Sequence, residues 1–144
     1  MIGTISGTVT GVALIFVYRL LSKYFTPKLM AATTLVAIAF IYVGFSLKDN
    51  AASLIALEVM VALVLYFVAM IGYVRNGVAI AYGIIFHGVW DICHHNGFLI
   101  GTRIPGYWPP FCLTIDIIDG LYFLVIFKNL KKPAIFKMHG SSLG

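Results

Sequence analysis

The sequence predicts an all-α membrane protein, a single bundle of five transmembrane helices. Hydrophobic residues make up 61% of the chain and charged residues only 10%, which leaves too little polar surface for a soluble domain of 144 residues. A window of about 19 residues separates apolar segments long enough to cross a bilayer. The expected spans are residues 2–21, 29–47, 51–73, 78–96 and 110–130, in one domain over residues 1–144.

The basic residues predict the orientation of the bundle, because Lys and Arg are enriched in cytoplasmic connections. Of the ten, those at one end of the expected helices are Arg19, Lys23, Lys28, Arg75, Lys128, Lys131, Lys132 and Lys137. Only Lys48 and Arg103 fall at the other end. We therefore expect a cell-membrane protein with its N-terminus outside and a basic tail, residues 131–144, in the cytoplasm. Anionic lipid headgroups beside that face explain the net charge of +5 without a nucleic-acid partner.

The first two spans carry none of the acidic residues. The first opens with Gly3, Gly7 and Gly11 at four-residue spacing, a pattern that lets a second helix approach closely. We expect this face to pack within the chain, or to form a homo-oligomer or a larger membrane complex. The second span shows small and aliphatic side chains with Tyr42 near its outer boundary, and its expected role is structural.

The acidic residues are concentrated in the later spans. Of the five, Asp49 alone lies in a loop, and the others are Glu58, Asp91, Asp116 and Asp119. A carboxylate near a helix centre costs about 2.5 to 3.5 kcal/mol on insertion scales, so these four are expected to face inward. There each needs a proton, a partner or a cation. Counted along the helices at about 1.5 Å per residue, they reach the same outer half of the bilayer as the membrane histidines.

The fourth span contains the run His87-Gly-Val-Trp90-Asp91-Ile-Cys-His94-His95. At helical spacing its three imidazoles and its carboxylate share about a third of the helix circumference and form one polar stripe. Imidazole nitrogen and carboxylate oxygen are the ligands that borderline divalent cations take. The sequence predicts a metal site, with zinc or iron favoured and manganese compatible, that draws on His87, Asp91, His94, His95, Asp116 and Asp119. Because adjacent histidines diverge by about 100° around a helix, His94 and His95 are not expected to bind the same ion.

The function predicted from these residues is a metal-dependent hydrolase. An open position on the metal would make a bound water acidic enough to supply hydroxide. Glu58, from a separate helix, is the expected catalytic residue, as a general base or as a ligand to a second ion. A site about 10 Å below the outer surface suits a lipid-like substrate from the outer leaflet. The alternatives are a di-iron membrane oxidoreductase, a proton or ion path, an accessory subunit of a membrane complex, and a purely structural polar network.

An irregular connection is expected between the last two spans, because residues 97–110 contain three Pro and three Gly. Tyr107 and Trp108 suit the headgroup region. In the alternative interpretation the segment is a lid over the polar site, and Arg103 meets an anionic group of the substrate. Cys93 and Cys112 lie toward the outer ends of adjacent spans, where both a disulfide and inert thiols are compatible with the sequence.

The run His87-x-x-Trp90-Asp91-x-x-His94-His95, with Glu58 upstream in a small multi-pass protein, resembles a group of bacterial membrane proteins classed as a domain of unknown function. That resemblance covers mainly the fourth span and implies no activity. The spacing is also similar to the histidine boxes of membrane di-iron desaturases and hydroxylases, which draw on many more histidines. The alkaline ceramidase and adiponectin-receptor group is similar in placing a zinc held by His inside a helical bundle, but it has more spans and a C-terminal H-x-x-x-H pair.

Overall fold

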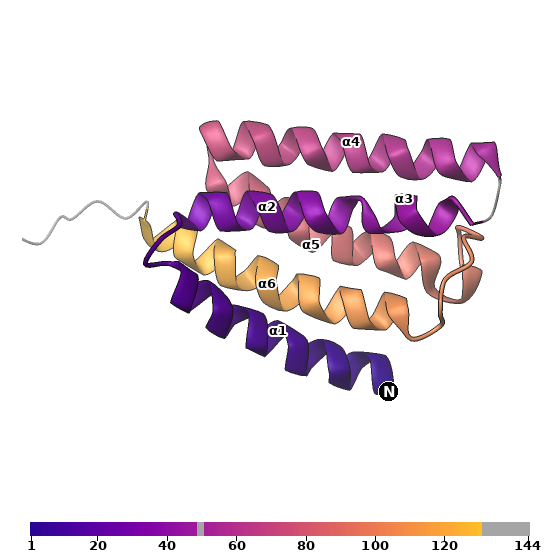
Figure 1. Cartoon of the computed structure of the whole chain (residues 1–144), viewed down its shortest axis with the longest axis horizontal. Helices are drawn as coiled ribbons and strands as arrows, with labels where there is room; N and C mark the ends of the chain where they lie inside the picture. The colour runs from indigo at the N-terminus through magenta and orange to yellow at the C-terminus, as the bar shows by residue number, and fades with distance from the viewer. Residues whose placement is uncertain (49–50, 131–144) are drawn as a thin grey trace, which may run out of the picture.

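The computed structural model describes residues 1–48 and 51–130, and it confirms an all-helical membrane fold (Figure 1). The helices are α1 (Ile2–Leu21), α2 (Pro27–Ala39), α3 (Ile41–Ser46), α4 (Ala52–Val74), α5 (Gly77–His94) and α6 (Trp108–Leu130), with a 3-10 turn, η1, at His95–Gly97. Because α2 and α3 form one span, the described residues contain five segments long and apolar enough to cross a membrane. The expected basic tail and the loop residue Asp49 lie outside the described residues.

Local sequence signals set several helix ends. The Thr26 side chain accepts a hydrogen bond from the backbone N–H of Leu29, and Pro27 stands in the first turn of α2, where its missing N–H is not needed. The Asn76 side chain caps α5 in the same way. At the other end of α5, His95 takes an extended conformation with a ψ angle of 116°, so the helix ends at His94. Asn96 and Gly97 follow with left-handed φ angles of 53° and 69°.

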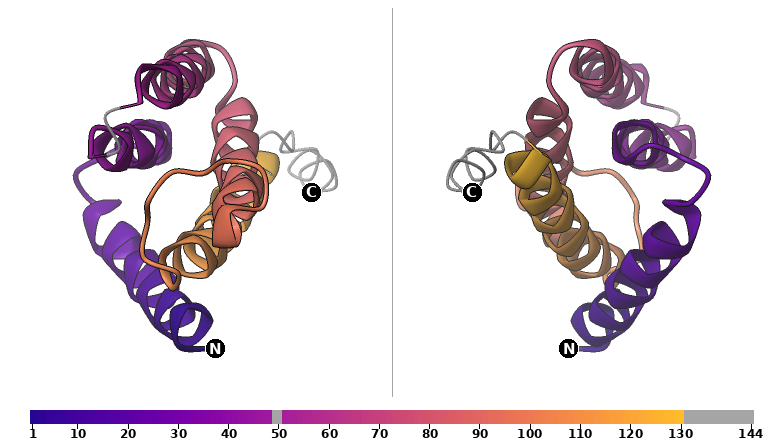
Figure 2. Two further views of the ribbon diagram at one scale, coloured as in Figure 1. Left: turned by 90° about the vertical axis from the view of Figure 1, so that its right-hand side faces the viewer. Right: turned by 90° about the vertical axis from the view of Figure 1, so that its left-hand side faces the viewer.

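The helices form one bundle, as the end views show (Figure 2), and they share one apolar core. Helix α5 packs against α4 and α6, α6 also packs against α1, and α2 packs against α4 and α5. Fully buried apolar side chains at this centre include Leu35, Leu65, Ile80, Ile84 and Phe123. The outward faces of the helices carry exposed apolar side chains, as expected where helices meet lipid.

The glycine face of α1 is buried against α6. A Cβ atom added at Gly7 would lie 2.6 Å from the backbone oxygen of Phe111, a distance that real Cβ contacts do not reach. Gly3 and Gly11 contact the same helix in register, against Pro110 and Ile118. The small residues therefore serve packing within the chain, the first of the two expected roles, and association between copies stays a prediction.

The predicted polar residues gather toward one end of the bundle. The N-terminus, α3, the start of α4, the end of α5 and the start of α6 all lie at this end, which we call the site end (right-hand side of Figure 1). The connection between α5 and α6 crosses the same end (Figure 2). Which side of the membrane the site end faces stays a prediction from the basic residues.

Candidate metal centre

Helix α5 turns three polar side chains into the bundle. His87, Asp91 and His94 are each at most 1% exposed, because spacings of four and three residues place them on one helical face. His95 does not continue this face. It is exposed and belongs to η1, where the chain has already left the helix. The expected stripe therefore ends at His94.

His87 and Asp91 meet Asp116 of α6 in one compact group. One ligand atom from each residue lies within 4.8 Å of those of the other two, and all three side chains are buried. The Nδ1 atom of His87 lies 2.6 Å from Oδ2 of Asp116. When Nδ1 carries the proton and donates it to this carboxylate, Nε2 keeps a free lone pair. Of the expected ligands, these are the three that come together.

Two atoms of this group lack a hydrogen-bond partner among the described residues. Nε2 of His87 and Oδ2 of Asp91 are both buried, and neither forms a hydrogen bond. Buried polar atoms without partners are rare in native proteins, and each one needs an explanation such as an ion or a water molecule. A nitrogen and an oxygen that are both available within one buried group are suitable ligands for a divalent cation.

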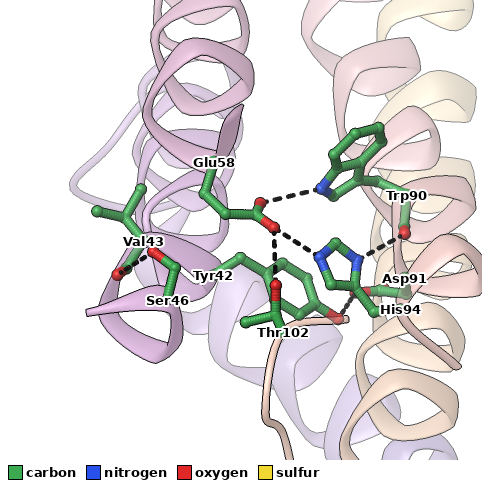
Figure 3. Close-up of polar contacts among 8 residues, drawn as sticks. All are labelled: Tyr42, Val43, Ser46, Glu58, Trp90, Asp91, His94 and Thr102. Carbon is green, nitrogen blue, oxygen red and sulfur yellow. Dashed lines mark hydrogen bonds and ion pairs between the residues drawn. The ribbon is translucent and has the colours of Figure 1, made fainter. Parts of the chain in front are cut away.

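Tyr42 of α3 holds the other oxygen of Asp91. Its hydroxyl donates to Oδ1 of Asp91 over 2.6 Å, and its ring stacks on the His94 imidazole with centroids 4.0 Å apart (Figure 3). The expectation of a purely structural second span missed this contact. The available signal was a tyrosine hydroxyl in a segment without charged residues.

Glu58 of α4 and His94 form a second, separate pair, in which Nε2 of His94 lies 2.7 Å from Oε1 of Glu58 (Figure 3). The same carboxylate accepts hydrogen bonds from the Trp90 indole and the Thr102 hydroxyl, each at 3.3 Å. The other ring nitrogen of His94 faces the backbone oxygen of Trp90 at 3.1 Å. Because both nitrogens of His94 face acceptors, an imidazole with a proton on each nitrogen matches these partners.

Asp119 lies one turn along α6 from Asp116, but it contacts a different helix. Its Oδ2 accepts a hydrogen bond from the hydroxyl of Tyr18 in α1 at 2.9 Å. That hydroxyl also lies 3.0 Å from the hydroxyl of Thr34 in α2. Asp119 is thus outside the compact group, although it shares a helix with Asp116.

Comparison with known proteins identifies the family of this chain. The model of a family of unknown function, DUF6010, matches residues 2–129. The chain belongs to this family. Neither the curated proteins nor the solved structures contain a significant match to it. Membership in DUF6010 agrees with the resemblance to membrane proteins of unknown function, and it assigns no activity. The similarities to histidine-box enzymes and to the ceramidase and receptor group stay hypotheses.

In this DUF6010 protein a pocket of about 250 Å³ opens beside the compact group, between the end of α5 and the start of α6. Its lining residues are Asp91, Ile92, His95, Pro109, Pro110 and Leu113. Asp91 therefore belongs both to the group and to the pocket wall. Cys93 and Cys112 are free thiols, so the disulfide that the sequence left open is not formed in the structure.

The connection between α5 and α6 contacts the second pair. Thr102 is buried, and its hydroxyl donates to Glu58. Ile100 is also buried, whereas Tyr107 is exposed. In this DUF6010 protein the segment thus covers the Glu58–His94 pair with its middle part and exposes a headgroup-type aromatic at its end.

Proposed function

We propose that this protein is a membrane-embedded, metal-dependent hydrolase in which His87 and Asp91 bind one divalent cation, and Asp116 orients the His87 ring from its other nitrogen. The observation that carries the proposal is the pair of buried, unpartnered ligand atoms, Nε2 of His87 and Oδ2 of Asp91. Both atoms belong to residues of the compact group. A cation between them would satisfy both atoms at once.

Charge balance supports a divalent ion. Asp91 and Asp116 bring two buried carboxylates to a low-dielectric region, where uncompensated negative charge is costly. A divalent cation offsets both charges. The hydrogen bond between Asp116 and Nδ1 of His87 also resembles the carboxylate–histidine contacts that orient imidazole ligands toward a metal. One imidazole with carboxylate oxygens favours zinc, with iron or manganese also compatible.

The chemistry proposed is hydrolysis of an ester or amide bond. A cation held by His87 and Asp91 would have coordination positions open for water, and it would supply Lewis-acid activation of a carbonyl group and of that water. The water oxygen adds to the carbonyl carbon, the bond to the alcohol or amine breaks, and a proton of the water leaves with that group. His95 lines the pocket, and its imidazole can carry this proton.

The pocket favours an amphiphilic substrate. Apart from Asp91 and His95 its walls are apolar, formed by Ile92, Leu113 and two prolines. Such a lining accepts an aliphatic chain and places the adjacent polar group beside the carboxylate. The site lies near the end of helices that are apolar enough to span a membrane, so a lipid-like molecule can reach it without leaving the bilayer.

A two-metal oxidoreductase has less support. A second ion would need ligands such as Glu58 and His94, which are already bonded to each other. Glu58 accepts from Trp90, His94 and Thr102, so we assign it to positioning these groups rather than to general base catalysis.

The test compares two aspartates of one helix, Asp116→Asn and Asp119→Asn. Purified protein in mixed micelles is stripped of metal, reloaded with zinc, and assayed on amphiphilic esters and amides. We expect D116N to lose zinc affinity and hydrolysis by more than about 10-fold, and D119N to keep both. Hydrolysis that survives metal removal would refute the metal dependence. Zinc binding without hydrolysis of any amphiphile would refute the enzymatic part alone.

A further inference from the structure

We infer that Tyr42 is a positioning residue of the metal site, because it holds one oxygen of Asp91 and leaves only the other for the cation. The inference rests on the proposed function, and it adds a residue from a helix that supplies no ligand. Tyr42 is separated from Asp91 by 49 positions in the sequence. Its effect on the metal is exerted entirely through the Asp91 carboxylate.

The hydrogen bond fixes which oxygen is available. The Tyr42 hydroxyl lies 2.6 Å from Oδ1 of Asp91, at the short end for a phenol and a carboxylate. Oδ2 of the same carboxylate is buried without a partner among the described residues. Asp91 is therefore arranged to bind through one oxygen while its other oxygen is occupied.

Packing fixes the hydroxyl itself. The Tyr42 ring is 1% exposed and lies nearly parallel to the His94 ring, with 13° between their planes. His94 is in turn held at both of its nitrogens, by Glu58 and by the backbone of Trp90. The phenol is thus packed against a side chain of α5 that is itself bonded to α4, and such support orients the hydroxyl toward Asp91 (Figure 3).

One-oxygen binding has a chemical consequence. A carboxylate that binds through both oxygens occupies two coordination positions, whereas one that binds through a single oxygen leaves a position open. Catalytic zinc sites keep such a position for water or substrate, and structural sites do not. By holding Oδ1, Tyr42 keeps the site in the open form that hydrolysis requires.

The chain contains a matched control for this contact. Tyr18 is also a buried tyrosine, and its hydroxyl donates to a buried aspartate, Asp119, at 2.9 Å. That aspartate lies outside the compact group. Tyr18→Phe and Tyr42→Phe therefore remove the same type of hydrogen bond, one away from the metal group and one inside it.

The experiment measures metal affinity and coordination in the two variants. Zinc affinity is determined by competition with a chelator, and coordination is read from the visible absorption of the cobalt-substituted protein. We expect Y42F to bind zinc about 10 to 100 times more weakly than wild type, and Y18F to bind like wild type. The cobalt spectrum of Y42F should lose intensity, because a second oxygen of Asp91 raises the coordination number, while the spectrum of Y18F should not change.

The outcomes separate the inference from the proposed function. If the wild-type protein binds neither zinc nor cobalt, the proposed function and the inference about Tyr42 are both refuted. If it binds them and Y42F matches Y18F in affinity and spectrum, the inference alone is overturned. A second measurement does not need Y42F to fold: zinc loading of Y18F should change the tyrosine near-ultraviolet absorption through Tyr42, and an unchanged spectrum would overturn the inference.

Discussion

Glu58 and His94 face each other across α4 and α5 with 2.7 Å between a carboxylate oxygen and a ring nitrogen. Both side chains are almost fully buried, and Trp90 and Thr102 donate to the same carboxylate. The pair is distinct from the compact group of His87, Asp91 and Asp116. The Glu58–His94 pair therefore has partners for all its polar side-chain atoms, whereas the compact group contains unpartnered ligand atoms.

Because of this difference, we expect removal of the Glu58 carboxylate to affect stability and not zinc binding. Glu58→Gln removes one member of a buried pair and leaves His94 without its charged partner. We expect the free energy of unfolding in micelles to fall by about 3 to 5 kcal/mol, with zinc stoichiometry retained. Denaturant titration followed by circular dichroism measures the first quantity, and metal analysis measures the second. Unchanged stability with lost hydrolysis would instead favour Glu58 as the general base.

The loop contact predicts a smaller and more local effect. Thr102→Val removes a single hydroxyl donor to Glu58, and we expect a loss of about 1 kcal/mol in stability. Hydrogen exchange of the backbone amides in residues 98–107 should accelerate. Thr8→Val is the control, because the Thr8 hydroxyl bonds only within α1. Equal exchange in both variants would show that Thr102 does not hold the loop.

The helix packing predicts a contrast between two glycines. At Gly7 an added methyl group would meet the backbone of Phe111, whereas at Gly44 nothing lies within 4 Å of the added atom. We expect Gly7→Ala to destabilise the protein by about 1 to 3 kcal/mol, because α1 must move away from α6. Gly44→Ala should leave the melting temperature unchanged or raise it slightly. A Gly7→Ala variant as stable as Gly44→Ala would contradict the close packing.

Much of the fold follows from the sequence, because hydropathy alone determines which segments can cross a membrane. The burial of Glu58, Asp91, Asp116 and Asp119 follows for the same reason, since a carboxylate facing lipid is costly. This free-energy cost predicts that each carboxylate is buried, but it does not predict which residue is its hydrogen-bond partner. Tyr18 and Asp119 are 101 positions apart, and no pattern within one helix connects them.

Two departures from the helical-spacing expectations have local causes. His95 itself adopts an extended backbone conformation, so α5 ends at His94 and the His95 side chain is exposed. Asp116 and Asp119 diverge by about 60° around α6, which is enough to direct one toward α5 and the other toward α1. Spacing placed these residues on one face, but the positions of the neighbouring helices determine their contacts.

The distribution of basic residues predicts that the site end faces outward and that the C-terminus is cytoplasmic. Fusion of the chain to a reporter that is active only in the cytoplasm tests this directly. We expect activity when the reporter follows the C-terminus and none when it precedes Met1. The reverse result would place the pocket beside Asp91 on the cytoplasmic side, with substrates drawn from the inner leaflet.

The most direct test of the metal centre is the metal content of protein purified from membranes, measured for wild type, His87→Ala and His95→Ala. His87 belongs to the compact group, whereas His95 is exposed in η1, eight positions along the same sequence run. We expect about one divalent ion per chain in wild type and in H95A, and loss of the ion in H87A. Equal metal content in H87A and wild type, or no metal in any of the three after reloading with zinc, iron and manganese, would contradict the site.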